Sequence, residues 1–577
     1  MRAAHALRAP AAQLELTGWR ASLVFGALAL AFVALAGRSL YLQGVEDEFL
    51  QGQGKARYAR ELEVPAHRGR IVDRHGDALA ISTPVRSLWA FAEKLEATPQ
   101  QWSELAKLLD TTPQALRRKL AAADDFVYLA KRIPPELAQR ALALGIKGLY
   151  EENEFRRYYP AGEVMGHVVG FTGDRDAGQE GIELAQQTWL GGRAGSRRVI
   201  INRRGDVVED VASVREPQAG RDLALAIDSR LQYLAFREIR AAVLEQKAKA
   251  GGLVILDTRT GEILALANWP AFNPNKLDRD ARERMRNRAL TDVFEPGSTL
   301  KPFTAAAALD SGIVTPNTVI DTQKGAMTIG GATIHDAHAA GSLTVEQVIQ
   351  KSSNVGAAKI ALQLPAQRMW QTLSDAGFGA PVGTGYPGEV SGRLRPAKSW
   401  RPIEQATISY GHGISTNLVQ LARAYLVFAS DGQVKPATLL KTGAPATGRQ
   451  VIKPETARAV RRMLEMATQP GGTAPKAQIV GYRVAGKTGT AHKLEGKGYT
   501  NKYLSSFVGF APASQPRLIV AVMIDEPSAG EHYGGAVAAP VFSTVMGGAL
   551  RLLGVPADAP ANNVILPAED AMIREDT

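Results

Sequence analysis

A run without charged residues near the start of the chain is the strongest single constraint on its fold. Residues 21–37 contain no Asp, Glu, Lys or Arg and are bounded by Arg20 and Arg38. As a helix they span about 25 Å, and the next residues to 42 complete the ~30 Å of a hydrocarbon core. We therefore predict one transmembrane helix at 21–42. Because arginines precede it, we expect residues 1–20 in the cytoplasm and the bulk of the chain in the periplasm.

A cleaved signal peptide is the alternative interpretation of the same run. Ala34, Leu35 and Ala36 fit the small-residue pattern of a cleavage site. However, a long segment precedes the run, and the run itself exceeds the apolar core of a typical signal peptide. We therefore expect an uncleaved anchor, which N-terminal sequencing of membrane-extracted protein can test.

Composition limits the remaining possibilities. The 577 residues are too many for one hydrophobic core, so we expect two or three folded units. Cysteine is absent, which excludes disulfides and cysteine metal sites. His335 and His338 lack a third ligand, and no phosphate-binding glycine loop is evident, so we expect neither a metal nor a cofactor. The net charge of +11 favours membrane and wall surfaces; no nucleic-acid motif accompanies it, so we do not expect nucleic acid as a partner.

Hydrophobic alternation and turn residues predict several elements. We expect strands at 62–65, 71–73, 252–257, 262–267, 505–510 and 518–524, helices at 99–109, 134–144 and 229–246, and turns at 203–206 and 258–261. A turn at 220–222 marks the predicted domain boundary. Beyond it, strands at both ends with helices between them imply a sheet whose first and last strands meet.

Ser298 and Lys301 form the most informative chemical pattern. Three residues apart on a helix, a hydroxyl and an amine lie on one face. Pro302 belongs in the first turn of a helix, so we expect that helix to begin near Ser298. A neutral lysine there can accept the serine proton and make the hydroxyl a nucleophile. The helix start would direct backbone N–H groups toward an oxyanion.

Two short motifs follow this pair in the sequence, and each of them is matched at two places. Ser352–Asn354 ends a predicted helical segment, whereas Ser415–Asn417 has the same spacing. We prefer Ser352 because another apolar helix follows it, but the second match stays open. Lys487–Gly489 follows a strand-like stretch, whereas Lys441–Gly443 leads into a loop and is rejected.

Ser-x-x-Lys with Ser-x-Asn and Lys-Thr-Gly is the signature set of penicillin-binding proteins and class A β-lactamases. Further matching stretches lie at 68–76, 158–162, 167–173, 178–183, 485–491, 507–512 and 517–527. With them the chain resembles a class B penicillin-binding protein, a peptidoglycan D,D-transpeptidase, of the division-specific (septal) subgroup of Gram-negative bacteria. The resemblance implies an α/β fold: an α+β pedestal at 43–220, a transpeptidase domain at 221–556 with an antiparallel sheet flanked by helices, and a tail at 557–577.

The resemblance also implies roles for individual residues. Ser298 attacks the penultimate D-alanine carbonyl of a D-Ala-D-Ala stem peptide, and Lys301 accepts its proton. Ser352 relays a proton to the leaving D-alanine, Asn354 holds Lys301 and the substrate amide, and Lys487 contributes positive charge. The remaining residues implied in substrate binding are Ser353, Tyr410, His412, Thr488, Gly489 and Thr490.

His412 departs from the subgroup, which usually has tyrosine there. It could alter β-lactam fit or pH response, or it could replace one flat ring by another without effect.

The implied function is cross-linking of stem peptides in septal wall synthesis, with acylation by β-lactams. The alternatives are an elongation-specific transpeptidase, a D,D-carboxypeptidase, a β-lactam sensor or an inactive scaffold. The implied location is the inner membrane at the septum, with one membrane pass. The implied partners are a SEDS-type glycan polymerase, packed on the 21–42 helix, and other division proteins.

Overall fold

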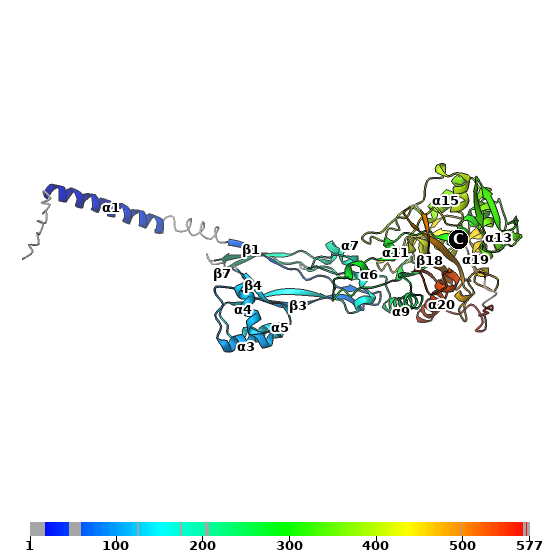
Figure 1. Ribbon diagram of the computed structural model, residues 1–577. Coiled ribbons are helices and arrows are strands. Elements are labelled where there is room, and N and C mark those ends of the chain that lie inside the picture. The colour runs from blue at the N-terminus through cyan, green and yellow to red at the C-terminus, as the bar shows by residue number, and fades with distance from the viewer. Residues whose placement is uncertain are drawn as a thin grey trace, which may run out of the picture. The chain divides into compact units, whose positions relative to one another are not determined.

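The computed structural model describes residues 18–44, 59–123, 126–173, 176–201, 207–496, 498–568 and 573 (Figure 1). The chain forms two compact units. The first comprises residues up to 66 together with 193–218, and the second comprises 67–192 and 219–577. Most of the predicted 1–20 tail, the predicted turn at 203–206 and parts of the predicted 557–577 tail lie outside the described residues.

Helix α1 (Gly18–Gly44) contains the predicted transmembrane segment and is apolar on all sides. Its stretch Gly18–Leu42 has a mean hydropathy of 2.0 in the most apolar window, and 0% of that window is buried. Arg20 lies over the ring of Trp19 and Arg38 over the ring of Tyr41, so each end carries groups that favour a membrane interface. A helix with no polar face is stable in lipid rather than in water.

The first unit also contains a three-stranded antiparallel sheet. Its strands are β1 (Ala59–Val64), β6 (Gly195–Ile201) and β7 (Val207–Arg215), in the order β1-β6-β7. The predicted strand at 62–65 therefore begins earlier than expected.

The N-terminal part of the second unit is built around the long strand β3 (Ala78–Phe91). β3 pairs antiparallel with β4 (Phe126–Ile133) on one side and β5 (Leu149–Tyr158) on the other. Three helices, α3 (Pro99–Leu108), α4 (Pro113–Ala121) and α5 (Pro135–Leu142), share a buried core with these strands. The predicted helix at 99–109 is confirmed, and it begins where Thr98 and Gln101 form a capping box.

Two of the sequence stretches that carry the resemblance meet in a buried ion cluster. Arg68 Nε donates to Glu183 Oε2 at 2.6 Å, and Arg157 Nε donates to Glu183 Oε1 at 2.7 Å. All three side chains are buried. Because a buried carboxylate needs full compensation, this cluster ties the stretches around residues 68 and 183 together.

A five-stranded antiparallel sheet forms the centre of the C-terminal part. Its order is β10 (Ile263–Trp269), β9 (Ala250–Asp257), β19 (Leu518–Asp525), β18 (Gly498–Ala511) and β17 (Ala485–Glu495). β9 pairs with β19, so the prediction that the first and last strands meet is confirmed. β17 is the last strand in this order and forms one edge of the sheet.

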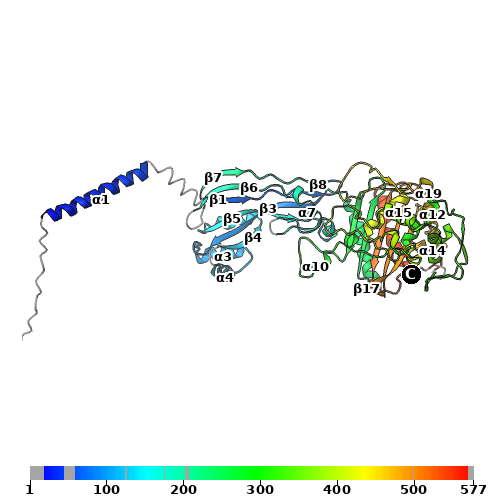
Figure 2. The same ribbon diagram turned by 90° about the horizontal axis from the view of Figure 1, so that it is seen from above.

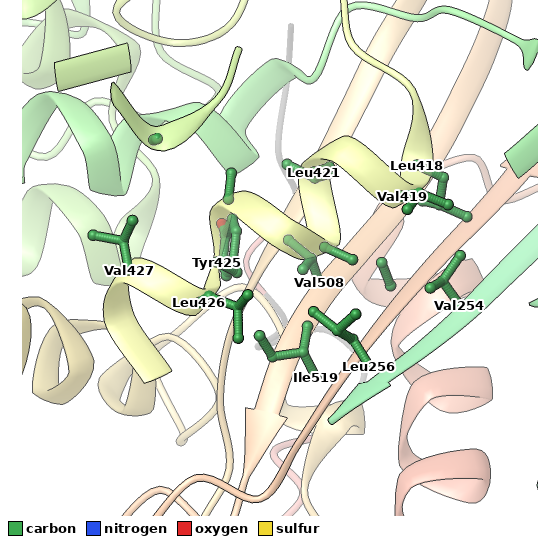
Figure 3. Close-up of a cluster of buried hydrophobic side chains, with 14 of the residues drawn as sticks. Val254, Leu256, Leu418, Val419, Leu421, Tyr425, Leu426, Val427, Val508 and Ile519 are labelled. Carbon is green, nitrogen blue, oxygen red and sulfur yellow. The ribbon is translucent and has the colours of Figure 1, made fainter. Parts of the chain in front are cut away.

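Helices cover both faces of this sheet, as the predicted antiparallel sheet flanked by helices requires. α9 (Ser229–Glu245) and α20 (Gly534–Leu552) pack on one face. α20 is apolar and long enough to span a membrane, but 56% of its apolar window is buried, which makes it a core helix. On the other face, Figure 3 shows Val254, Leu256, Val508 and Ile519 beside side chains of α17 (Leu418–Ala424) and α18 (Leu426–Ala429).

A group of further helices contains the ends at which Ser298, Ser352 and Ser353 lie. α12 (Lys301–Asp310) and α14 (Asn354–Leu362) pack against each other (Figure 2). The other helices of the group are α13 (Val345–Lys351), α15 (Ala366–Ala376), α16 (Pro402–Ile408) and α19 (Pro454–Met466).

Candidate active site

Ser298 lies in the short 3₁₀ helix η2 (Gly297–Leu300), and α12 begins directly after it at Lys301. We predicted an ordinary helix start near Ser298. The first turn is tighter because Pro302 has no N–H to donate to the Ser298 carbonyl four residues back. The Lys301 N–H donates a hydrogen bond to the Ser298 carbonyl instead.

Lys301 is the centre of the site. Its Nζ lies 2.8 Å from Ser298 Oγ, 3.0 Å from Ser352 Oγ and 2.6 Å from the Ser352 carbonyl oxygen. Lys301 is only 1% exposed and Ser298 only 2% exposed. One buried amine therefore touches two hydroxyls, which is the arrangement that moving a proton between them requires.

Ser352 reaches Lys301 because the backbone turns sharply between two helices. It ends α13 in the left-handed conformation, with φ 59° and ψ 40°. Ser353 then begins α14, with its Oγ accepting from the Gly356 N–H at 2.8 Å. A non-glycine residue held at positive φ stores strain that the neighbouring contacts must offset.

Asp336 supplies such contacts and was not identified from the sequence. Its Oδ2 accepts from Ser353 Oγ at 2.7 Å, and its Oδ1 accepts from the Val355 N–H at 2.9 Å. The neighbouring His335 carbonyl accepts from Asn354 Nδ2 at 2.9 Å. In the sequence, Asp336 has no signal beyond its place between His335 and His338.

The edge strand β17 carries Lys487, Thr488, Gly489 and Thr490. Lys487 is fully buried, with Nζ 3.0 Å from Thr488 Oγ1. Thr488 Oγ1 also lies 2.8 Å from Thr473 Oγ1, a residue that the sequence analysis did not single out. Thr490 Oγ1 accepts from the Gly534 N–H at 3.1 Å.

Gly489 has no room for a side chain in this fold. A Cβ there would lie 2.6 Å from Ser506 Oγ and 2.8 Å from the Pro296 carbonyl oxygen. The resemblance implies Gly489 in substrate binding, and this stays a prediction. The structure shows that neighbouring protein already occupies the space a Cβ would take, so glycine is required for packing of β17.

The two competing sequence matches serve structural purposes. Asn417 is buried and caps α17, accepting from the Gln420 N–H at 2.7 Å. Its Nδ2 donates to the Val390 carbonyl at 2.6 Å. Thr442, in the other match, bonds Glu262 through its N–H at 2.8 Å.

His412 and Tyr410 line a cavity of about 330 Å³ together with Asn354 and Tyr499. The His412 ring lies 5.2 Å from that of Tyr410 and 6.0 Å from that of Tyr499. Burial, with added repulsion from Lys301 and His492, lowers the pKa of His412 to about 4. His412 is therefore a neutral ring at physiological pH, and its enclosed Nε2 has no hydrogen-bond partner among the residues that the structure describes.

Taken together, a lysine-activated serine beside the edge strand of an antiparallel sheet defines a site of serine acyl transfer. Comparison with known proteins agrees with this class. The family model "Penicillin binding protein transpeptidase domain" matches residues 251–547, and the model "Penicillin-binding Protein dimerisation domain" matches residues 63–225. The chain belongs to the penicillin-binding proteins, and the resemblance to the class B group is confirmed.

Individual relatives cover almost all of the chain. The probable peptidoglycan D,D-transpeptidase PenA of Neisseria meningitidis serogroup A is 42% identical over 94% of each chain. The peptidoglycan D,D-transpeptidase FtsI of Escherichia coli K12 is 41% identical over 97% of this chain and 96% of its own. The apo structure of the TP domain of Burkholderia pseudomallei penicillin-binding protein 3 is 50% identical, with a TM-score of 0.54, over 58% of this chain and 98% of its own.

Proposed function

We propose that this protein is a membrane-anchored peptidoglycan D,D-transpeptidase that cross-links stem peptides in septal wall synthesis and is acylated by β-lactams. The observation that carries the proposal is the buried Lys301 Nζ in contact with both Ser298 Oγ and Ser352 Oγ. The names of the relatives PenA and FtsI, and the exposed apolar helix α1, support it.

The first half-reaction forms an acyl-enzyme. Ser298 Oγ attacks the penultimate D-alanine carbonyl of a stem peptide while Lys301 Nζ takes its proton. The new C–O bond gives an oxyanion that the N–H groups of Ser298 and Thr490 receive. When the peptide C–N bond breaks, Ser352 passes a proton from Lys301 to the leaving D-alanine amine. We assign the terminal carboxylate of the donor to the Thr488 and Thr490 hydroxyls.

The second half-reaction transfers the acyl group. An amine of another stem peptide attacks the ester carbonyl, the bond to Ser298 Oγ breaks, and the proton released by the amine returns to that oxygen through Lys301. Attack by water instead would give carboxypeptidase activity. A β-lactam follows only the first half because its leaving amine stays attached to the acyl group.

The test is labelling of the full chain by a fluorescent penicillin, followed by mass spectrometry of the tryptic peptide that contains Ser298. We expect an adduct in the wild type and none in Ser298→Ala. Ser399→Ala is the matched control, since Ser399 is exposed and outside the site. An adduct of equal yield in Ser298→Ala would contradict the proposal.

The finer assignments follow from the same reasoning. We place the non-catalytic pedestal at 43–220, the transpeptidase domain at 221–556 and the chain in the inner membrane at the septum. A SEDS-type polymerase and other division proteins are the proposed partners, with the polymerase on the exposed apolar surface of α1. Midcell localisation of the tagged chain supports the septal role, whereas uniform lateral localisation would favour the elongation enzyme.

A further inference from the structure

A second, larger cavity lies beside the site and has no assigned role. Its volume is about 600 Å³, in the range of small-molecule sites. Segments at 292–295, 393–395 and 413–415 form one side, and the ends of β17, β18 and β19 form the other. The segment 292–295 ends three residues before Ser298, so one continuous stretch of backbone lines the cavity and carries the nucleophile.

Two residues connect this cavity with the smaller one that His412 lines. His492 lines both cavities. Glu295 lines the larger one and accepts hydrogen bonds from the Gly413 N–H at 2.8 Å and from Tyr499 Oη at 3.0 Å, and Tyr499 lines the smaller one. A ligand in the smaller cavity could therefore extend past Glu295 and His492 into the larger one.

The lining of the larger cavity is mainly apolar, with an exposed apolar rim. Phe294, Ile414 and Leu504 are buried parts of the wall. Val293 and Leu494, in contrast, are 51% and 60% exposed. Exposed apolar side chains around a concavity are typical of surfaces that receive a ligand.

Most charges in the lining already have a partner. Lys493 Nζ lies 2.7 Å from Asp525 Oδ1, and Arg395 Nη1 lies 2.9 Å from Glu404 Oε1. Asp292 accepts from Arg288 at 3.0 Å. Glu295 is held by neutral donors, and burial raises the pKa of its carboxyl group.

Arg393 differs from these residues. Its side chain is exposed, lines the cavity and has no hydrogen-bond or ion-pair partner among the described residues. Only its backbone is engaged, pairing with Ser415 at 2.9 and 3.1 Å. A guanidinium without a partner at the edge of an apolar cavity is suited to a carboxylate, which it can bind through two parallel hydrogen bonds.

We propose that this cavity is a binding subsite for an apolar group that carries a carboxylate, with Arg393 as its anion-binding residue. The inference rests on the proposed function in one respect: the natural ligand would be a carboxylate-bearing side chain of the peptide substrate. It adds the chemical class of that group, which the reacting D-alanines do not specify. It also makes Arg393 a residue for substrate specificity that lies outside the three sequence motifs.

The direct test uses two matched probes, 4-(4-fluorophenyl)butyrate and its primary amide, titrated into full-length protein in nanodiscs and followed by fluorine NMR. We expect the wild type to bind the carboxylate more tightly than the amide. Arg393→Gln should weaken carboxylate binding about tenfold, in line with loss of one charge-assisted interaction, and should remove the preference over the amide. Val293→Glu places a negative charge at the rim of the cavity. Because it repels the carboxylate probe, it should also weaken binding of that probe.

The matched control is Arg279→Gln, because Arg279 is exposed and outside the cavity. It should bind both probes as the wild type does. Equal carboxylate affinity in the wild type and Arg393→Gln, or no binding of the carboxylate to the wild type, would overturn the inference.

Two further readouts separate this inference from the proposed function. Labelling by fluorescent penicillin in the same samples reports on Ser298 alone: labelling without probe binding rejects the subsite, and probe binding without labelling rejects the enzymatic proposal. In a cross-linking assay, Arg393→Gln should raise KM for the peptide substrate more than it lowers kcat. A fall in kcat with KM unchanged would show a general structural role instead of ligand binding.

Discussion

Asp336 offers a sharp test of how the site is held together. Its carboxylate receives hydrogen bonds from Ser353 Oγ at 2.7 Å and from the Val355 N–H at 2.9 Å. These bonds secure the turn in which Ser352 adopts φ 59° and touches Lys301. Asp336→Ala removes both acceptors at the point where α14 begins. We therefore expect Ser352 and Asn354 to lose their fixed position relative to Lys301.

The size of the effect follows from those two contacts. A hydrogen bond to a charged group contributes about 1.5–3 kcal/mol, but Asp336 is half-buried and water can replace part of what is lost. We expect a loss of about 2 kcal/mol in the free energy of unfolding. If most of this lost stabilisation comes from the turn that holds Ser352, the acylation rate should fall by about 10- to 100-fold, since 1.4 kcal/mol corresponds to a factor of ten.

Two measurements test this prediction. Stopped-flow labelling with a fluorescent penicillin gives the second-order acylation rate, and thermal unfolding gives the change in stability. Asp336→Asn keeps one carbonyl acceptor and should give an intermediate rate. Asp280→Ala, at an exposed aspartate outside the site, is the control and should match the wild type. An acylation rate within twofold of the wild type in Asp336→Ala would show that Asp336 does not position the catalytic turn, even if the protein became less stable.

Three further outcomes are expected. Lys301→Met should reduce acylation by about 10³-fold or more, because it removes the only proton acceptor that we assign to Ser298, and stopped-flow labelling measures this. His412 has a folded pKa of about 4, below its unfolded value, so the unfolded state binds more protons and stability should fall as pH drops from about 6.5 to 4. His412→Tyr should lose less stability over that range in thermal scans, and parallel curves for the two proteins would contradict the assignment. Glu183→Gln should destabilise the fold by about 3–5 kcal/mol in chemical denaturation, since it removes the negative charge that two buried guanidinium groups contact.

Features that depend only on neighbouring residues can be predicted from the amino-acid sequence. The uncharged run at 21–37 is sufficient to predict α1, because lipid spanning depends on length and polarity alone. The pairing of Ser298 with Lys301 follows from helical spacing, which holds even though the first turn is a 3₁₀ helix. The strands β9 and β10 and their connecting turn likewise follow from alternation and turn residues.

Contacts between distant parts of the chain, in contrast, become visible only in the folded protein. Ser352 and Ser415 fit the same pattern, and what separates them is that α13 ends in a left-handed turn against Lys301 while Asn417 is used to cap α17. Asp336 and Arg393 belong to no motif. The fold places Asp336, which directly follows strand β13 (Ala332–His335), against Ser353 and Val355, and it places Arg393 at the larger cavity. The physical reason is that short-range geometry is set by the backbone, whereas the meeting of segments far apart in sequence is set by how whole faces pack.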